Sequence, residues 1–560
     1  MLRTGRGWWW LPALLLAACG SNGEGADDGN EGGDAADVEP DVPDAEPDVP
    51  EVTDTADVPE AAPPLDPALG EVIELEAGAD GGFTADLATP TANRRYGLVL
   101  YSATWATGML TYELTATGAA ATRLGEAKAG MPEGPDRGYR DLLADIPTIA
   151  RAVREGTARF PRDPLPRPTV GERRSFQIED PTAGVVTIPA DCLRVGTNIA
   201  MWMDRSPGGG ADPDPAVLDE VVARFDDTVL PREREFFGQE PDISTDGVVN
   251  LLWSPIVDAI GALAFFAPCD LFDSASLPLG CTYSNEQEIL YATPPGTRWG
   301  GRASAILDTV SHELQHLIYF NRKVLVSGAS GNENIYVMEG WAELGQDVVG
   351  YGRSTLMTAA GGLEGSDIWG AFELLRNGGS YSTDLTRNQM LYGAAYLLVR
   401  YLWDRMGGER IETDGTITDL GAIAWAHDTI DSAQGGRRNF EDSCGTPMDD
   451  LLFDWYTALL LTGRTDAAGA PLPVEPRFTY LPRVADPITG NMRGFDPFAS
   501  TGWYTLNGPV TVTVATADGQ IPGTGNELVI LDADGTSPAL SVSVVGGEGA
   551  NLRVRVVRLR

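Results

Sequence analysis

Two of the three histidines in this chain of 560 residues stand four positions apart, as His312 and His316, and Glu313 directly follows the first of them. On a helix, positions four apart lie on one face, about 5–6 Å from each other. Two imidazoles at that spacing can bind one metal ion, and the neighbouring carboxylate can transfer a proton. This triplet is therefore the first candidate for a reactive centre.

The residues around the triplet are typical of a helix. Apolar side chains recur at Ile306, Val310, Leu314 and Leu317 within a predicted helix at residues 303–323. The histidines fall on the opposite side of that helix, so we expect the apolar stripe to enter a core and the histidines to face a cleft. A catalytic zinc site has three protein ligands and one open position, so a downstream His, Asp or Glu is still needed.

The sequence HELQH, followed by EGWAE, resembles the motifs of the gluzincin family of zinc peptidases, and most closely those of its hyicolysin-type secreted members. The resemblance covers residues 200–465 and implies a thermolysin-like domain. It also implies that Glu339, on a second predicted helix at residues 333–349, completes a zinc site with His312 and His316. In that family the residue at the position of Glu313 is the general base that acts on a zinc-activated water.

Other parts of the resemblance are less complete. The family places at Glu343 an acid that orients a zinc histidine, although a solvated helix charge is the alternative, and Asp308 is a competing candidate for the same role. Related aminopeptidases read NEG where this chain has Met338 before Glu339, so exopeptidase specificity is not carried over.

Hydrolysis at such a site also needs a hydrogen-bond donor for the oxyanion. Tyr392 opens the stretch YGAAYLLVRYLWDRMGG, within a predicted helix at residues 389–406, and this stretch resembles the aminopeptidase helix that carries the oxyanion tyrosine. His427 is the second candidate. Tyr392 could equally be an aromatic core residue.

The N-terminus resembles a bacterial lipoprotein signal. Residues 1–18 contain two arginines and a short apolar run, which ends in Leu-Ala-Ala before Cys19. The resemblance implies lipidation of Cys19, an extracytoplasmic location and, in a Gram-negative cell, the outer membrane. Residues 19–66 contain sixteen acidic residues and no Lys or Arg, which predicts an extended, disordered tether.

The other four cysteines form an even set in a chain predicted to be exported, where disulfides persist. Cys269 and Cys281 lie twelve positions apart, and we predict that they pair. The pairing of Cys192 with Cys444 is a weaker inference. Since no CxxC spacing occurs, a cysteine-bound metal is disfavoured.

Alternating apolar residues predict a β-rich N-terminal domain at residues 67–165, which could be a propeptide, and a β-sandwich-like C-terminal domain at residues 466–560. Between them, at residues 166–465, strands are followed by helices, among them one at residues 448–461, so the fold class is α+β. The sequence DADGT at Asp532 could begin a calcium loop, but a β-turn is favoured because no ligand series follows.

The formal net charge of −41 excludes a basic nucleic-acid surface. These features together predict a lipid-anchored zinc endopeptidase that cleaves protein or peptide substrates and contacts the membrane through its anchor. Two alternatives remain open, a non-catalytic surface binding protein with a retained metal site and an aminopeptidase or amide hydrolase of the same fold. The oligomeric state is not predicted.

Overall fold

The chain divides into two compact units, residues 1–61 and residues 62–560. The computed structural model describes residues 62–89, 93–105, 108–120, 146–298, 301–331, 333–352 and 391–560, with short gaps between 499 and 515. The predicted signal peptide, Cys19 and most of the tether therefore lie outside the described residues. Residues 62–66, predicted as tether, belong to the second unit, where Asp66 pairs with Arg94 at 2.6 Å. No helix among the described residues is long and apolar enough to cross a membrane.

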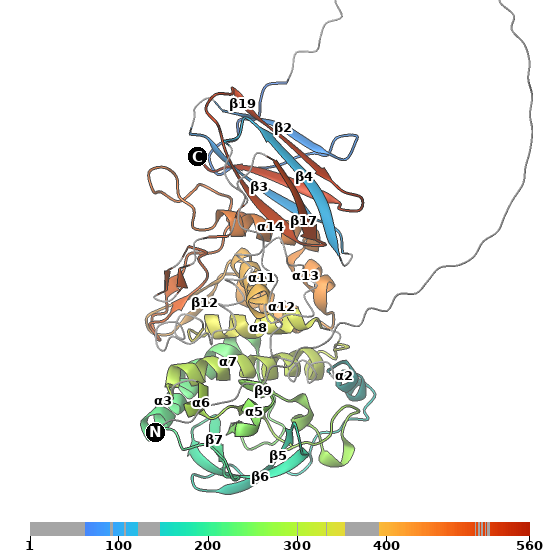
Figure 1. Ribbon diagram of the computed structural model, residues 1–560. Helices are drawn as coiled ribbons and strands as arrows, with labels where there is room; N and C mark the ends of the chain where they lie inside the picture. Colours follow the sequence, from blue (N-terminus) through green and yellow to red (C-terminus); the bar gives the residue numbers. More distant parts are fainter. Residues whose placement is uncertain are drawn as a thin grey trace, which may run out of the picture. The chain divides into compact units, whose positions relative to one another are not determined.

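A six-stranded mixed sheet has the strand order β5-β6-β7-β8-β10-β9 (Figure 1). The strands are β5 (Arg173–Asp180), β6 (Gly184–Val195), β7 (Ile199–Asp204), β8 (Val249–Trp253), β9 (Ala264–Phe266) and β10 (Ile289–Ala292). Strands β7, β8 and β10 are parallel, and β9 pairs antiparallel with β10 at one edge. Every residue of β7 and β8 is buried, as expected for central strands covered on both faces.

Of the main helices, two lie between β7 and β8 in the chain and the others follow the sheet, so the fold is mixed α and β, in agreement with the predicted class. The main ones are α3 (Pro215–Arg224), α4 (Leu230–Phe237), α7 (Ala303–Phe320), α8 (Ile335–Val348), α11 (Leu391–Arg405), α12 (Ala422–Ile430), α13 (Gly436–Cys444) and α14 (Met448–Leu461). The bounds of α7, α8, α11 and α14 confirm the four helices predicted from apolar periodicity.

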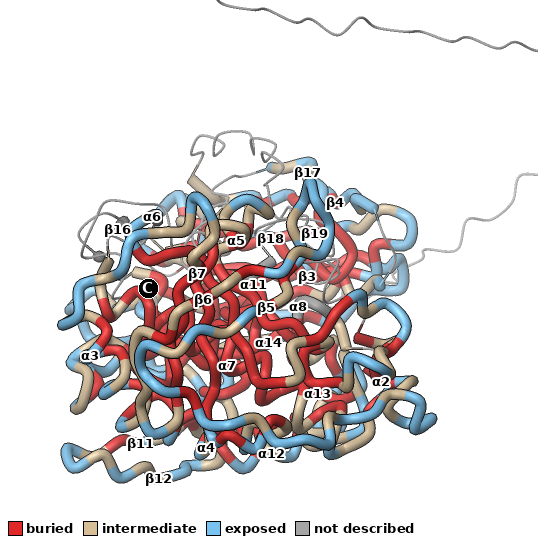
Figure 2. Tube along the Cα trace, turned by 90° about the horizontal axis from the view of Figure 1, so that it is seen from below, coloured by how far each residue is buried: buried red, intermediate tan, exposed pale blue. Residues whose placement is uncertain are grey.

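Helix α7 is the central element of this region. It contacts β9 and β10 on one side and α8 on the other, and it lies in the buried interior shown in Figure 2. The apolar stripe from Ile306 to Leu317 is buried as predicted. On the opposite face, which contacts α8, His312 is 8% exposed and His316 is 4% exposed.

The strands near the two ends of the chain form one β-sandwich. Its sheets have the orders β1-β20-β3-β18 and β17-β4-β19-β2. The strands are β1 (Val72–Glu74), β2 (Phe83–Ala88), β3 (Arg95–Ser102), β4 (Met109–Thr117), β17 (Thr516–Pro522), β18 (Asn526–Asp532), β19 (Ala539–Gly546) and β20 (Leu552–Arg558). The sequence predicted two separate β domains, and the pairing shows that this was wrong.

The physical reason lies in the strand neighbours. Strand β3 pairs with β18 and β20, and β4 pairs with β17 and β19, so each of these N-terminal strands lies between two C-terminal ones. In both sheets each strand from one terminal segment pairs only with strands from the other segment, so neither segment forms a sheet alone. Removal of residues 67–165 as a propeptide would leave four C-terminal strands without the partners that join them.

The β-sandwich packs on helix α14. Tyr101 Oη donates to Asp449 Oδ1 at 2.7 Å, and Arg555 Nη1 pairs with Asp454 Oδ1 at 2.8 Å. The Arg555 guanidinium also lies 3.9 Å from the ring centroid of Phe453. Apolar residues of β3, β18 and β20 belong to the same core as those of α14, so the sandwich packs firmly onto the helices.

Of the two predicted disulfides, one is confirmed and one is wrong. The Cys269–Cys281 disulfide is present, whereas Cys192 and Cys444 are both free, so that weaker pairing was wrong. Burial raises the pKa of the Cys192 thiol to about 11, which is the behaviour of an inert core cysteine. Asp532 forms a bidentate ion pair with Arg95 at 2.7 and 2.8 Å, which favours the turn over a calcium loop.

Candidate metal centre

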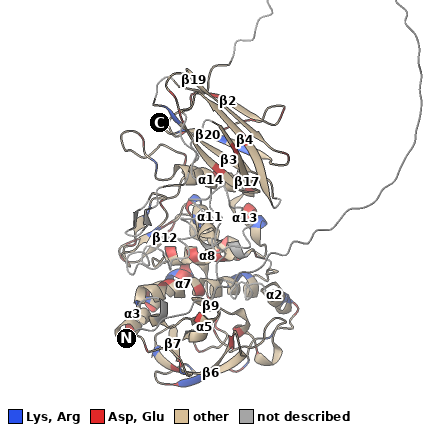
Figure 3. Cartoon of the chain, viewed as in Figure 1, with Lys and Arg blue, Asp and Glu red and all other residues tan. Residues whose placement is uncertain are grey.

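Two helices bring the candidate ligands together. Helix α7 carries His312, Glu313 and His316, and α8 carries Glu339 and Glu343. Figure 3 shows acidic residues gathered on both helices. The centre therefore depends on how closely α8 can approach its neighbours.

Two glycines of α8 allow that approach. A Cβ added to Gly340 would lie 2.6 Å from Val399 Cγ2 in α11, and one added to Gly345 would lie 3.1 Å from Gln315 Cγ in α7. Only a residue without a side chain fits at the first position, since real Cβ contacts this short are essentially unknown. The glycines in EGWAELG thus seat α8 between α7 and α11.

The donor atoms of His312, His316 and Glu339 converge. The two Nε2 atoms are 3.1 Å apart, and Glu339 Oε2 lies 3.3 Å from that of His312 and 3.6 Å from that of His316. Two ligand atoms at about 2.0–2.1 Å from a tetrahedral zinc lie about 3.3–3.4 Å apart. The three separations fit one such ion, and these residues form a group that could hold it.

The surroundings of Glu339 support a cation at this position. The side chain is 1% exposed, and neither carboxylate oxygen has a hydrogen-bond partner among the described residues. A buried carboxylate without hydrogen bonds is costly unless a positive charge compensates it. The two imidazoles lower its pKa to about 2 although burial alone would raise it, so the group is an anion.

Glu343 lies beside the other nitrogen of His312. Its Oε1 is 3.7 Å from His312 Nδ1, on the side of the ring away from Glu339. A carboxylate there can fix the imidazole tautomer and direct Nε2 toward a metal. Asp308, the competing candidate, is also buried, and its backbone oxygen accepts a 3.2 Å hydrogen bond from Gln346 Nε2, which joins α7 to α8.

Burial and charge act in opposite directions on the two histidines. Burial would lower the pKa of His312, but Glu339, Glu313 and Glu343 raise it to about 10. For His316 burial dominates, and its pKa is lowered. The negative field that holds a proton on His312 is also one that attracts a divalent cation, so proton and metal compete for this ring.

This competition gives a prediction for the metal-free protein. At pH 8 we expect one imidazole of the pair, that of His312, to be protonated, because its raised pKa lies above this pH. Nitrogen-15 NMR of histidine-labelled, chelator-treated protein measures this, and His312→Gln assigns the signal. Zinc should then displace the proton. Two neutral imidazoles in the pair at pH 8 would contradict the prediction.

The other predicted site residues are placed differently. Glu313 is 5% exposed and lies on α7 between the two ligands. Tyr392 is in the first turn of α11, but its side chain lies outside those that the structure describes. His427 Nε2 contacts the backbone oxygen of Glu235 in α4 at 2.9 Å, which gives this ring a structural contact.

Sequence reasoning missed Glu233 of α4. The residue is fully buried, burial raises its pKa well above the usual range, and His312 lowers it in turn. Its Oε1 would lie 3.1 Å from a Cβ at Gly345, so it is beside the contact of α7 with α8. The sequence does not distinguish Glu233 from Glu235, which lies on the same helix and is exposed.

A second group of carboxylates, from Asp242, Asp246 and Glu288, also has three oxygens within 4.8 Å of one another. Glu288 Oε2 accepts from Ser244 Oγ at 2.8 Å, and Asp246 Oδ1 accepts from Val248 N at 3.1 Å. These hydrogen bonds show that the carboxylates stabilise the loop before β8. We therefore assign no metal to this group.

Comparison with known proteins gives one distant similarity. No family model matches the chain. The neutral metalloprotease ShpI of Staphylococcus hyicus is 29% identical over 131 residues, which are 22% of this chain and 28% of ShpI. The match thus spans little more than a quarter of that protein. It supports a metallopeptidase in general, and a metal at the convergent donors of α7 and α8 agrees with it.

Proposed function

We propose that this protein is a zinc-dependent endopeptidase with a thermolysin-like arrangement of α7 and α8. The observation that carries the proposal is the convergence of His312, His316 and Glu339 at separations that suit one tetrahedral ion. Glu313, next to one ligand and not itself part of the donor group, favours catalysis, because a structural metal site does not need a general base.

When bound, zinc would lower the pKa of a water molecule and polarise the scissile carbonyl. Glu313 then takes a proton from the attacking water and delivers it to the leaving amine. Glu343 holds the orientation of His312.

Tyr392 is our proposed oxyanion donor, since the His427 ring already contacts α4. Tyr392→Phe should therefore lower kcat with zinc content unchanged, and a variant with wild-type kcat would exclude this role.

The proposed function is tested by metal analysis and casein digestion on the full chain. We expect one zinc per chain, loss of hydrolysis after chelation and recovery on addition of zinc. Peptides blocked at the N-terminus should be cleaved as well as free ones, because the NEG signature is absent. A stably zinc-loaded protein that cleaves neither casein nor peptides would favour a binding protein.

We also propose that Cys19 is lipidated and anchors the protein outside the cytoplasm, with the outer membrane as the destination in a Gram-negative cell. The support is the sequence LAAC and the acidic segment that follows it. Partition into detergent and sensitivity to globomycin should both disappear in Cys19→Ala. A mature protein that begins at another residue would exclude the anchor.

A further inference from the structure

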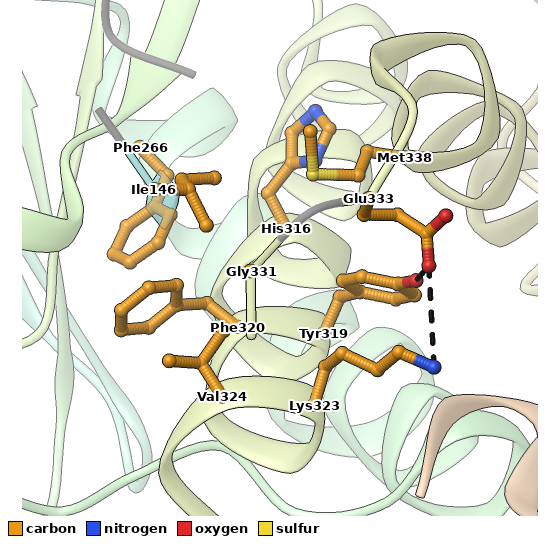
Figure 4. A pocket seen from close by; sticks show the side chains of 10 residues that line it. All are labelled: Ile146, Phe266, His316, Tyr319, Phe320, Lys323, Val324, Gly331, Glu333 and Met338. Atoms are coloured by element: carbon orange, nitrogen blue, oxygen red, sulfur yellow. Dashed lines mark hydrogen bonds and ion pairs between the residues drawn. The ribbon is translucent and has the colours of Figure 1, made fainter. Parts of the chain in front are cut away.

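A small cavity lies directly beside the candidate metal ligand His316. Its walls are mainly apolar, from Phe266 of β9, Phe320 at the end of α7, Val324 of the π-helix η4 (Asn321–Val326), Met338 of α8 and Ile146 (Figure 4). The space left between these side chains is about 20 Å³, room for about one water molecule. Because His316 is itself a wall, the cavity adjoins one ligand of the proposed metal.

The polar residues at one end of the cavity are occupied by one another. Tyr319 Oη donates to Glu333 Oε2 at 2.7 Å, and Lys323 Nζ lies 3.9 Å from the same oxygen. Lys323 Nζ also donates to the backbone oxygen of Thr429 at 2.9 Å. Breaking these buried contacts to bind a polar group would be costly, so the cavity suits an apolar one.

Ile146 comes from α2 (Ile146–Arg154), a helix that the sequence placed in the N-terminal β domain and not in the catalytic region. Its apolar face, with Ile146 and Ile149, is buried in the main core. Arg154 Nη1 donates to the backbone oxygen of Ala329 at 2.9 Å. Helix α2 therefore forms part of the cavity wall.

Gly331 fixes how closely α2 approaches. This glycine has a φ of 74°, and a Cβ added to it would lie 2.9 Å from the backbone oxygen of Ile146 and 2.8 Å from Ala150 Cβ. The turn at Gly331 thus contacts α2 backbone directly. The position of the Ile146 side chain in the cavity follows from backbone packing and not from a mobile side chain alone.

We propose that this cavity is the subsite for the substrate side chain next to the scissile bond, and that Ile146 restricts it to small apolar side chains. The inference rests on the proposed peptidase function and names a specificity-determining residue for it. Met338 supports it, because this residue precedes the proposed ligand Glu339 and contributes an apolar wall to the cavity.

The expected effect concerns preference between substrates. One methylene in a hydrophobic pocket changes the ratio of kcat/KM values by about 10- to 200-fold. Wild type should prefer Ala to Leu or Phe at one of the two positions that flank the scissile bond. Ile146→Ala should raise the Leu-to-Ala ratio of kcat/KM by at least about tenfold, and Ile146→Val should raise it less.

The experiment uses the full zinc-loaded chain and peptides blocked at both ends, with Ala, Leu or Phe at each flanking position in turn. Ile149→Ala is the matched control, since it makes the same change on α2 in a residue that does not line the cavity. Ile146→Val keeps the test valid if the alanine variant does not fold. Peptide affinities are also measured by calorimetry in Glu313→Gln, alone and combined with Ile146→Ala.

The outcomes separate the subsite from the proposed function. A shifted ratio in the Ile146 variants, with none in Ile149→Ala, supports the subsite. An unchanged Leu-to-Ala ratio of kcat/KM, or an equal change in Ile149→Ala, would overturn it. A uniform rise in kcat/KM for all peptides would also overturn it, because α2 would then block access of every substrate equally. If peptides bind with the shifted preference but no variant hydrolyses them, the peptidase function fails and the subsite stands.

Discussion

Glu313→Gln is expected to bind zinc as wild type does and to hydrolyse casein at least about a hundredfold more slowly, the low end of what a positioned proton-transfer group contributes. The amide keeps the size of the side chain and removes its basicity. The zinc ligands are untouched, because the donor group consists of His312, His316 and Glu339. The loss should appear in kcat with little change in KM, since the proton moves only as the transition state forms.

Glu235→Gln is the matched control for this change. It makes the same substitution in an exposed carboxylate on α4, at which neither metal binding nor turnover should respond. Metal analysis and casein digestion are carried out on the same preparations. Undiminished turnover in Glu313→Gln at full zinc content would remove the general-base role and revive the non-catalytic alternative.

The parts of this centre that the sequence predicted are local. His312 and His316 share a face because a helix repeats every 3.6 residues, and the apolar stripe of α7 specified that helix. Glu339 was predicted only through resemblance, because nothing local relates it to His316. The structural reason for their contact is the close packing of α8, which Gly340 and Gly345 permit.

The parts that the sequence could not predict are non-local. Gly97 of β3 pairs with Val557 of β20, and alternation along either strand says nothing about which distant strand is its partner. The same limit explains Cys192 and Cys444, whose pairing was inferred from an even count. It also explains α2, since a short amphipathic helix indicates an apolar face but not the surface that Ile146 will contact.

The second prediction with a large expected effect is that Glu339 and Glu343, one helical turn apart on α8, contribute differently to zinc affinity. Glu339→Ala should lose zinc at metal concentrations that saturate wild type, because it removes one of three ligands whose atoms converge within 4.8 Å. Glu343→Ala should keep a bound zinc but weaken its affinity about 10- to 100-fold, the usual cost of losing a residue that orients a ligand. Both variants make the same change on the same helix, so effects on α8 itself largely cancel.

The contrast follows from which nitrogen of His312 each carboxylate faces. Glu339 Oε2 is 3.3 Å from Nε2, the atom that also faces His316, whereas Glu343 Oε1 is 3.7 Å from Nδ1. Competition with a zinc-binding dye measures both affinities, and Glu343→Gln, which keeps an acceptor oxygen, should recover part of the loss. If Glu343→Ala removes zinc while Glu339→Ala retains it, the two roles must be exchanged, and the metal would lie on the Nδ1 side of the ring.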